Sequence, residues 1–278
     1  MPNDNWIRCS KRHMCPICGK PDWCMLAVDG CVVICSREPS EKHLGEAGWL
    51  HRIKESEGGP KNFPAKKLPS GPKPEMVNCY VRDWNKDPIR LLSRKLGVSE
   101  LSLNRLGIGV NRTEEYTFPM KDGNCRTIGF RIRNYRGQKW SVKGSSSGLF
   151  IPDTFHGDDT MYIVEGPTDT AAMLDLGLDC IGRPSCSGGK DYIVQFLSRH
   201  KVSVVILADR DVTDVAKRNT RMGALLLAKS IKHLCTGIKM IHPPFGKDPR
   251  EWVNDGATRA MVESVVKSTK YWTDKGTA

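Results

Sequence analysis

Residues 161–169, MYIVEGPTD, and residues 204–211, VVILADRD, decide the fold of this chain. Each stretch begins with an apolar run of strand length and ends in acidic side chains. These acidic residues are Glu165 and Asp169 in the first stretch, and Asp209 and Asp211 in the second. In an open α/β sheet, ligands bind beside the carboxyl ends of the strands. Clustered carboxylates there suit Mg²⁺, which keeps water molecules and substrate phosphates as its other ligands. The two stretches therefore predict a metal-dependent phosphate site.

The sequence around these stretches alternates between strands and helices. Strands are predicted near 161–164, 180–183, 202–208 and 238–242, and helices near 168–177, 189–200 and 214–235. That order predicts a parallel sheet with right-handed crossovers. A third charged strand end follows at Lys247-Asp248-Pro249. A lone aspartate at such a place is more often a helix cap than a ligand, so the prediction rests on the co-occurrence of three such ends.

Charge and hydropathy restrict the class of partner. The 278 residues include 43 Lys+Arg and 31 Asp+Glu, a formal net charge of +12, which favours polyanionic partners. No apolar run approaches the roughly 20 residues of a membrane span, and the start lacks the regions of a signal peptide. We find neither GxGxxG nor a Walker A motif, so neither a dinucleotide cofactor nor an ATP-driven motor is indicated. We expect a cytoplasmic protein that binds no membrane.

Cysteine spacing at the N-terminus indicates metal binding. Six of the eleven cysteines lie within residues 9–35, and Cys15-Pro-Ile-Cys18-Gly is typical of a zinc knuckle. A structural zinc site needs four ligands. Asp29-Gly30 predicts a two-residue hairpin turn, and pairing across this turn sets Cys24 opposite Cys35.

Other residues compete for the last two zinc positions. Cys31 and Cys35 would lie about 13 Å apart on one extended strand, too far to share an ion easily. Cys31 is therefore kept as the alternative to Cys24, and Cys9 and His13 are also near enough to compete. The predicted zinc ligands are Cys15, Cys18, Cys24 and Cys35.

Residues 77–157 combine a helical stripe with a basic, β-rich stretch. The apolar stripe, predicted to be core, is Ile89, Leu92, Leu96, Leu101 and Leu106. Ile128, Phe130 and Ile132 then alternate with Arg131 and Arg133, and Trp140 and Val142 alternate with Lys139, Ser141 and Lys143. Such alternation gives one buried face and one basic face. Because residues 126–143 hold six basic and no acidic side chains, we expect phosphate contact there; an ordinary soluble sheet face is the alternative.

Changes in composition mark the expected domains. They are a zinc-binding ribbon at 1–53, a flexible Pro-, Gly- and Lys-rich linker at 54–76, a basic subdomain at 77–157, an α/β domain at 158–256 and a C-terminal helix or tail at 257–278.

The motifs resemble those of a known family. The α/β region resembles a TOPRIM domain, the metal-binding fold that primases, topoisomerases and some nucleases share. The resemblance lies in a strand followed by EGPTD and a helix, a second strand followed by ADRD, and then GKDPREW. Over residues 10–256 the order of parts resembles the primase half of phage-type primase–helicases. The last zinc cysteines depart from that pattern, because they are spaced as hairpin partners. The implied fold class is α/β: an N-terminal zinc ribbon, a mixed α+β polymerase subdomain, and a TOPRIM domain with a mainly parallel sheet.

The resemblance implies a DNA primase, a nucleotidyltransferase acting as a DNA-directed RNA polymerase. It would make short primers on single-stranded DNA from nucleoside triphosphates, in a bacterial or phage-infected cytoplasm. Asp209 and Asp211 would hold Mg²⁺ or Mn²⁺, Glu165 would bind a second ion or accept a proton, and Asp169 would complete the acidic patch. The expected nucleotide or template contacts are Arg131, Arg133, Lys139, Lys143, Lys247 and Asp248. Because this sequence contains no Walker A motif, a separate replicative helicase is the expected partner, and the alternative is that the protein works without one.

Two other classes use the same parts. A TOPRIM nuclease would use the same carboxylates with water as the attacking group, although the zinc ribbon and basic subdomain favour polymerisation. A non-catalytic zinc and TOPRIM protein of recombination or replication would only bind DNA. Such proteins usually begin with helix-hairpin-helix elements, and none precedes Cys15.

Overall fold

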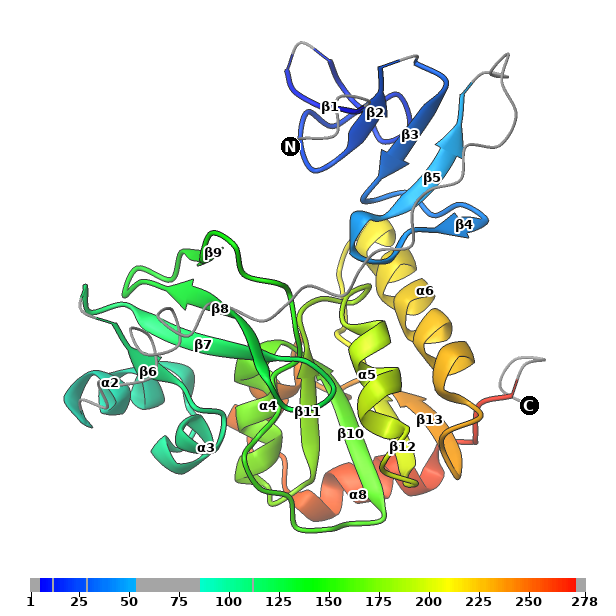
Figure 1. Ribbon diagram of the computed structural model, residues 1–278. Coiled ribbons are helices and arrows are strands. Elements are labelled where there is room, and N and C mark those ends of the chain that lie inside the picture. The colour runs from blue at the N-terminus through cyan, green and yellow to red at the C-terminus, as the bar shows by residue number, and fades with distance from the viewer. Residues whose placement is uncertain (1–5, 12, 29, 54–85, 112, 274–278) are drawn as a thin grey trace. The chain divides into compact units, whose positions relative to one another are not determined.

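The computed structural model describes residues 6–11, 13–28, 30–53, 86–111 and 113–273 (Figure 1). The predicted linker at 54–76 lies outside these ranges. The chain divides into two compact units, Met1–Leu68 with Thr213–Met222, and Pro69–Val212 with Gly223–Ala278. No helix in the described ranges is long and apolar enough to cross a membrane.

The larger unit is built on a parallel sheet with the strand order β11-β10-β12-β13. The strands are β10 (Thr160–Glu165), β11 (Cys180–Arg183), β12 (Ser203–Leu207) and β13 (Gly237–Ile241). All three pairings are parallel, which confirms the predicted α/β class. Because β10 lies between β11 and β12, the carboxyl ends of these three strands are neighbours.

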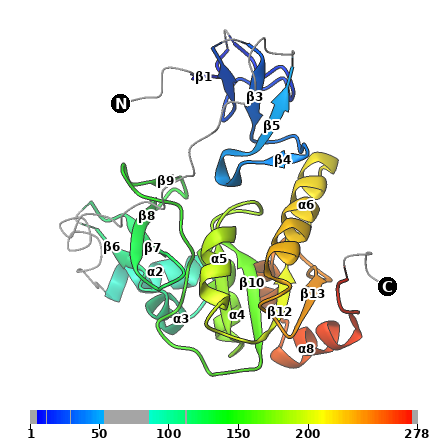
Figure 2. The same ribbon diagram turned by 45° about the vertical axis from the view of Figure 1, so that its right-hand side comes forward.

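Helices cover both faces of this sheet (Figures 1 and 2). The helices are α4 (Gly166–Asp175), α5 (Lys190–Leu197), α6 (Asp214–Ile231), α7 (Pro249–Asn254) and α8 (Arg259–Ser268). Tyr162 and Val164 of β10 share a core with α4, α7 and α8, whereas Met161 and Ile163 share one with α5 and the C-terminal part of α6. Alternate residues of one apolar strand are thus buried on opposite faces, as in doubly covered parallel sheets.

A smaller α+β part packs on the α4 side of the sheet. It contains α2 (Lys86–Leu96), α3 (Glu100–Arg105) and an antiparallel sheet in the order β6 (Gly109–Val110), β7 (Tyr116–Lys121), β8 (Thr127–Arg133) and β9 (Lys139–Ser141). Leu92, Phe118 and Leu174 belong to one continuous buried cluster, so this part and the parallel sheet share a core. The mixed α+β subdomain is confirmed.

The helical stripe was predicted wrongly at Leu101. Ile89, Leu92, Leu96 and Leu106 are buried as expected, but Leu101 is 68% exposed and Leu103 is fully buried instead. The helix breaks at Gly97, whose φ is +67°, and Ser99 caps a new helix by accepting a hydrogen bond from the backbone of Ser102. Because α3 begins again at this cap, its buried face is no longer in phase with that of α2.

The predicted alternation also fails on β9. Ile128, Phe130 and Ile132 are buried on β8, but all three residues of β9 are exposed and Trp140 is 41% exposed. β9 is the last strand of its sheet and pairs with β8 alone, so its apolar side chain is covered from one side only. Edge position, which the sequence does not reveal, explains the difference.

The two leucines of α3 give a direct test of this part of the fold. We expect Leu103→Ala to lower the free energy of unfolding by about 2–5 kcal/mol, because it leaves a cavity in the shared core. Leu101→Ala, its matched control, should change that free energy by less than about 0.5 kcal/mol. Urea denaturation of the zinc-loaded chain measures both. Equal effects would contradict the helix phase described here.

The smaller unit is an antiparallel sheet in the order β1-β2-β3-β5-β4. The strands are β1 (Trp6–Arg8), β2 (Met25–Ala27), β3 (Val32–Cys35), β4 (Lys42–His43) and β5 (Trp49–Arg52), with a short helix η1 (Gly45–Ala47). Leu26 pairs with Val33 and Met25 with Ile34, so the predicted hairpin register is confirmed.

Candidate functional site

Strand ends place the acidic side chains at one edge of the parallel sheet. β10 ends at Glu165, and α4 begins at Gly166, whose φ of +79° permits the sharp turn between them. Asp169 therefore stands in the first turn of α4, and it does not cap the helix, since Glu165 occupies the cap position. Asp209 follows β12 by two residues. The carboxylates thus meet where parallel sheets bind ligands.

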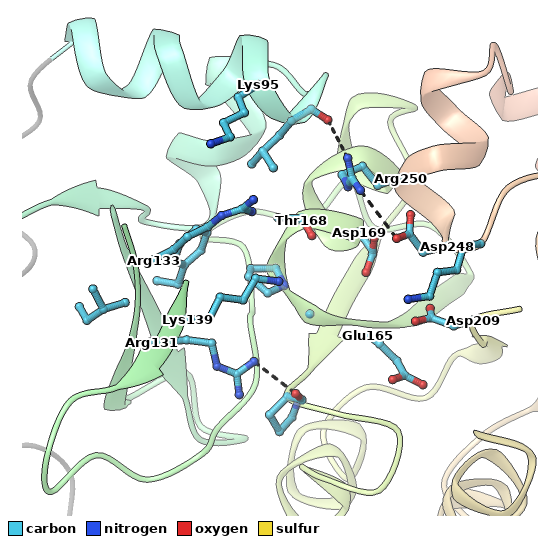
Figure 3. Close-up of a pocket in the computed structure, with 17 residues that line it drawn as sticks. Lys95, Arg131, Arg133, Lys139, Glu165, Thr168, Asp169, Asp209, Asp248 and Arg250 are labelled. Atoms are coloured by element: carbon cyan, nitrogen blue, oxygen red, sulfur yellow. Dashed lines mark hydrogen bonds and ion pairs between the residues drawn. The ribbon is translucent and has the colours of Figure 1, made fainter. Parts of the chain in front are cut away.

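A cleft of about 350 Å³ opens at this edge, with acidic and basic sides (Figure 3). Its acidic side chains are Glu165, Asp169, Asp209 and Asp248, and its basic ones are Lys95, Arg131, Arg133, Lys139, Lys247 and Arg250. Arg131, Arg133 and Lys139 come from β8 and β9 and lie across the cleft from the acidic group. Opposite charges facing each other across one cleft suit a ligand that carries both, such as a metal-bound phosphate.

Crowding changes the protonation of the acidic group. Burial, together with the nearby charges of Glu165, Asp248 and Asp211, raises the pKa of Asp209 to about 7, although Lys247 opposes the rise. Burial likewise raises the pKa of Asp169 well above its usual value, with Asp248 as the strongest neighbouring charge. The pKa values of Asp169 and Asp209 stay raised despite the neighbouring Arg250 and Lys247, so the like charges are only partly compensated, and a cation among them would stabilise the charged forms.

Two carboxylate oxygens in the cleft fit a metal ion. The Oδ1 atoms of Asp169 and Asp209 are buried and have no hydrogen-bond partner in the part of the chain that the structure describes. A buried oxygen without a partner costs free energy unless a ligand satisfies it. Carboxylate oxygens are the donors that Mg²⁺ and Mn²⁺ prefer. The residues present therefore fit a divalent cation.

The basic side shows the complementary crowding. Burial lowers the pKa of Arg133, and the charge of Arg250 lowers it further. Lys139 is exposed as a residue, but desolvation of its ammonium group at the cleft lowers its pKa as well, with Arg133 as the strongest neighbouring charge. Arg131 donates to the Pro184 carbonyl at 3.3 Å. Close cations of this kind are stabilised by an anion such as phosphate.

Two residues expected in the site stand outside the cleft lining. Lys143 follows β9 and is exposed, and Asp211 acts on Glu165 and Asp209 through its charge without lining the cleft. Asp248, one of the expected nucleotide or template contacts, lines the cleft close to Asp169 and Asp209. It also caps α7, because its Oδ1 accepts from the backbone of Glu251 at 2.8 Å.

Sequence reasoning missed Lys95 and Arg250. Arg250 donates to the Leu96 carbonyl at 3.4 Å and pairs with Asp248 at 3.8 Å, so it joins the end of α2 to the acidic group (Figure 3). Its backbone also hydrogen-bonds to Asp169. A signal for Arg250 existed, since it lies two residues after Asp248. None existed for Lys95, which occupies the exposed side of an ordinary amphipathic helix.

The smaller unit holds a second candidate metal site. The Sγ atoms of Cys15, Cys18, Cys24 and Cys35 all lie within 4.8 Å of one another. Backbone N–H groups of Arg37 and Glu38 donate to the Cys35 sulfur at 3.4 and 3.2 Å, and such donors stabilise thiolates. Four thiols at this spacing, three of them buried, fit a structural zinc ion.

The other residues that were possible zinc ligands lie outside the group of four thiols. Cys31 and His13 are not members of the four-thiol group. Cys9 is buried beside it, and its thiol interacts with that of Cys15. Burial would raise the pKa of Cys18, but hydrogen bonds from the backbone of Lys20 and from neighbouring thiols lower it to about 7.

Zinc content should separate Cys24 from Cys31. We expect Cys24→Ser to lose most of the bound zinc, because a tetrahedral structural site needs all four ligands. Cys31→Ser, the matched control, should keep about one zinc per chain, as the wild type should. Elemental analysis of the purified chains decides between them. Zinc loss in Cys31→Ser alone would reverse the assignment.

Comparison with known proteins relates the fold to DNA primases. No family model matches the chain, and no curated protein matches it. Among solved structures, the zinc-binding and RNA polymerase domains of Aquifex aeolicus primase align over 71% of this chain and 60% of that one, with a TM-score of 0.56 and 15% identity. The E. coli primase catalytic core aligns over 71% of this chain and 79% of that one, with a TM-score of 0.53 and 17% identity. A DnaG catalytic domain bound to single-stranded DNA aligns over 70% of this chain and 79% of that one, with a TM-score of 0.51 and 18% identity. The chain shares the fold of primase catalytic cores.

Proposed function

We propose that this chain is a DNA primase, which synthesises short RNA primers on single-stranded DNA from nucleoside triphosphates. The observation that carries the proposal is the cleft itself, where Glu165, Asp169, Asp209 and Asp248 face Arg131, Arg133 and Lys139 in the fold of primase catalytic cores. The zinc-type cysteine cluster supports it, because one structure of similar fold also has a zinc-binding domain.

The cleft supplies the groups that nucleotidyl transfer needs. The 3′-oxygen of one nucleotide forms a bond to the α-phosphorus of the next, and pyrophosphate leaves. The negative charge that develops on the phosphates is met by Arg133, Lys139 and Arg131 from the basic side. Burial and the charge of Asp211 raise the pKa of Glu165, and Arg183 lowers it; this carboxylate would either bind a second ion or accept the hydroxyl proton.

The acidic side would hold Mg²⁺ or Mn²⁺. Asp209 and Asp211, with Glu165, are the proposed ligands, and the unsatisfied Oδ1 of Asp169 completes the group. When bound, such ions polarise phosphate oxygens and orient the attacking and leaving groups. The zinc-binding unit would grip the template, and a separate replicative helicase would present it.

Primer synthesis on single-stranded DNA tests the proposal. The zinc-loaded chain is incubated with mixed-sequence template, labelled ribonucleotides and Mg²⁺ or Mn²⁺, and the products are separated by length. We expect short, template-dependent RNA that disappears with EDTA. Cleavage of the DNA in the absence of nucleotides would favour a nuclease. Tight DNA binding with neither activity would favour an accessory protein.

A further inference from the structure

A buried arginine, Arg183, pairs with Glu165 on the acidic side of the cleft but does not itself line the cleft. Arg183 is the last residue of β11, and its side chain is only 2% exposed. In the parallel sheet it is the direct partner of Glu165, at the carboxyl ends of neighbouring strands. The rule that identified Glu165 and Asp209, a polar residue where an apolar strand ends, applies to Arg183 as well.

The contacts of Arg183 form a closed set with Glu165 and the loop after β11. Its Nη2 pairs with Glu165 Oε1 at 3.2 Å, and its Nη1 donates to the Cys186 carbonyl at 2.6 Å. The backbone of Cys186 in turn hydrogen-bonds to Glu165. Glu165 is therefore held from below by two partners, while its side chain keeps 17% exposure toward the cleft.

Holding the loop does not by itself explain an arginine at this position. A buried charge costs free energy unless a partner compensates it, and one carbonyl needs only a neutral donor. The Nε of Arg183 adds to this cost, because it is buried without a hydrogen-bond partner among the residues the structure places. The compensating partner is Glu165, whose carboxylate is also repelled by the nearby carboxylates of Asp211 and Asp209.

We infer that Arg183 is a positioning residue, which fixes the orientation of Glu165 and keeps that carboxylate among its acidic neighbours so that it can serve the divalent cation. The inference rests on the proposed function, since it assumes that Glu165 acts on the metal or the reacting groups. Arg183 does not line the cleft, so any effect of Arg183 on the metal must pass through Glu165.

Mn²⁺ binding without nucleotide tests this role independently of synthesis. Calorimetry or electron paramagnetic resonance on the zinc-loaded full chain gives the affinity. We expect Arg183→Gln to weaken binding about 10- to 100-fold, the usual effect of removing a partner that orients a metal ligand. Arg105→Gln is the matched control: Arg105 also anchors a loop carbonyl, that of Thr154, and also has a buried Nε without a partner in the described ranges, but it is not among the cleft-lining residues. It should bind Mn²⁺ as the wild type does.

A double-mutant cycle separates positioning from a general structural role. In a Glu165→Gln background, adding Arg183→Gln should change Mn²⁺ affinity by less than about threefold, because the residue through which Arg183 acts has already been altered. Additive losses would overturn the inference. If Arg183→Gln does not fold, Arg183→Lys serves as the test. A lysine offers one compact charge in place of the planar guanidinium with its several donors, so this variant should bind Mn²⁺ about tenfold more weakly than the wild type. Wild-type affinity there would also overturn it.

The outcomes distinguish this inference from the proposed function. Equal Mn²⁺ binding by the wild type and Arg183→Gln would overturn the inference alone. Absence of Mn²⁺ binding in the wild type would overturn the metal-dependent function and the inference together. Weakened binding in Arg183→Gln, with no primer synthesis by the wild type, would support the inference while contradicting primase activity.

Discussion

Asp209→Asn is expected to reduce metal-dependent primer synthesis by at least about 10³-fold. A metal ion contributes several kcal/mol of charge stabilisation in the transition state, and each 1.36 kcal/mol corresponds to about tenfold in rate. Asn has nearly the same shape as Asp but lacks the charge that holds the ion. Asp209 is only half-buried, so solvent screens part of its repulsion with Glu165, Asp248 and Asp211. The metal-free variant should therefore be as stable as the wild type or slightly more so.

Two measurements on the same preparations check this. Primer yield should fall, and the melting temperature without divalent cations should not. Asp214→Asn is the matched control: its side chain is 98% exposed, it pairs only loosely with Lys217, and it should leave both quantities unchanged. Substantial synthesis by Asp209→Asn, above about a tenth of the wild-type rate, would show that this carboxylate does not hold a required ion.

The acidic group could be predicted because its position depends on local rules. An apolar run fixes a strand, the strand order fixes a parallel sheet, and the carboxyl ends of parallel strands meet at one edge. Glu165 and Asp209 follow from these rules. The zinc hairpin follows from a different local rule, the Asp29-Gly30 turn signal in the sequence, and Leu26 and Val33 pair as expected. Arg183 also ends an apolar strand, but its residue type gave no signal for a metal site, because arginine is not a ligand for Mg²⁺.

The remaining differences come from tertiary contacts that periodicity does not encode. Arg250 and Leu96 are far apart in the chain, and only the packing of α7 against the end of α2 brings them together. Leu101 was misplaced because a cap at Ser99 restarts the helix, and Trp140 because β9 is an edge strand. The sequence shows that Leu101 and Trp140 are apolar. Whether other side chains cover them depends on the helix cap and on the position of the strand in its sheet.

The basic side should be as important as the acidic side, and its charges should matter by position. We expect Arg133→Gln with Lys139→Gln to lower kcat/KM for nucleotides by about 10²-fold or more, because each charge-assisted hydrogen bond contributes about 1.5–3 kcal/mol. Arg136→Gln with Lys143→Gln removes the same charge from the same basic stretch, but both residues are exposed and outside the cleft lining. That pair should lower kcat/KM only a few-fold, through weaker long-range attraction of the DNA.

The crowding within each side of the cleft is the reason to expect this difference. Arg133 lies near Lys139 and Arg250, and burial and their repulsion lower the pKa values of Arg133 and Lys139. A triphosphate bound in the cleft relieves that repulsion directly, whereas charges that do not line the cleft, such as Lys143, are screened by solvent and salt. The loss in the cleft pair should therefore persist at high salt, and the small loss in the control pair should vanish. Equal losses, or losses that both vanish with salt, would mean that the basic stretch attracts DNA in general and does not bind the reacting phosphates.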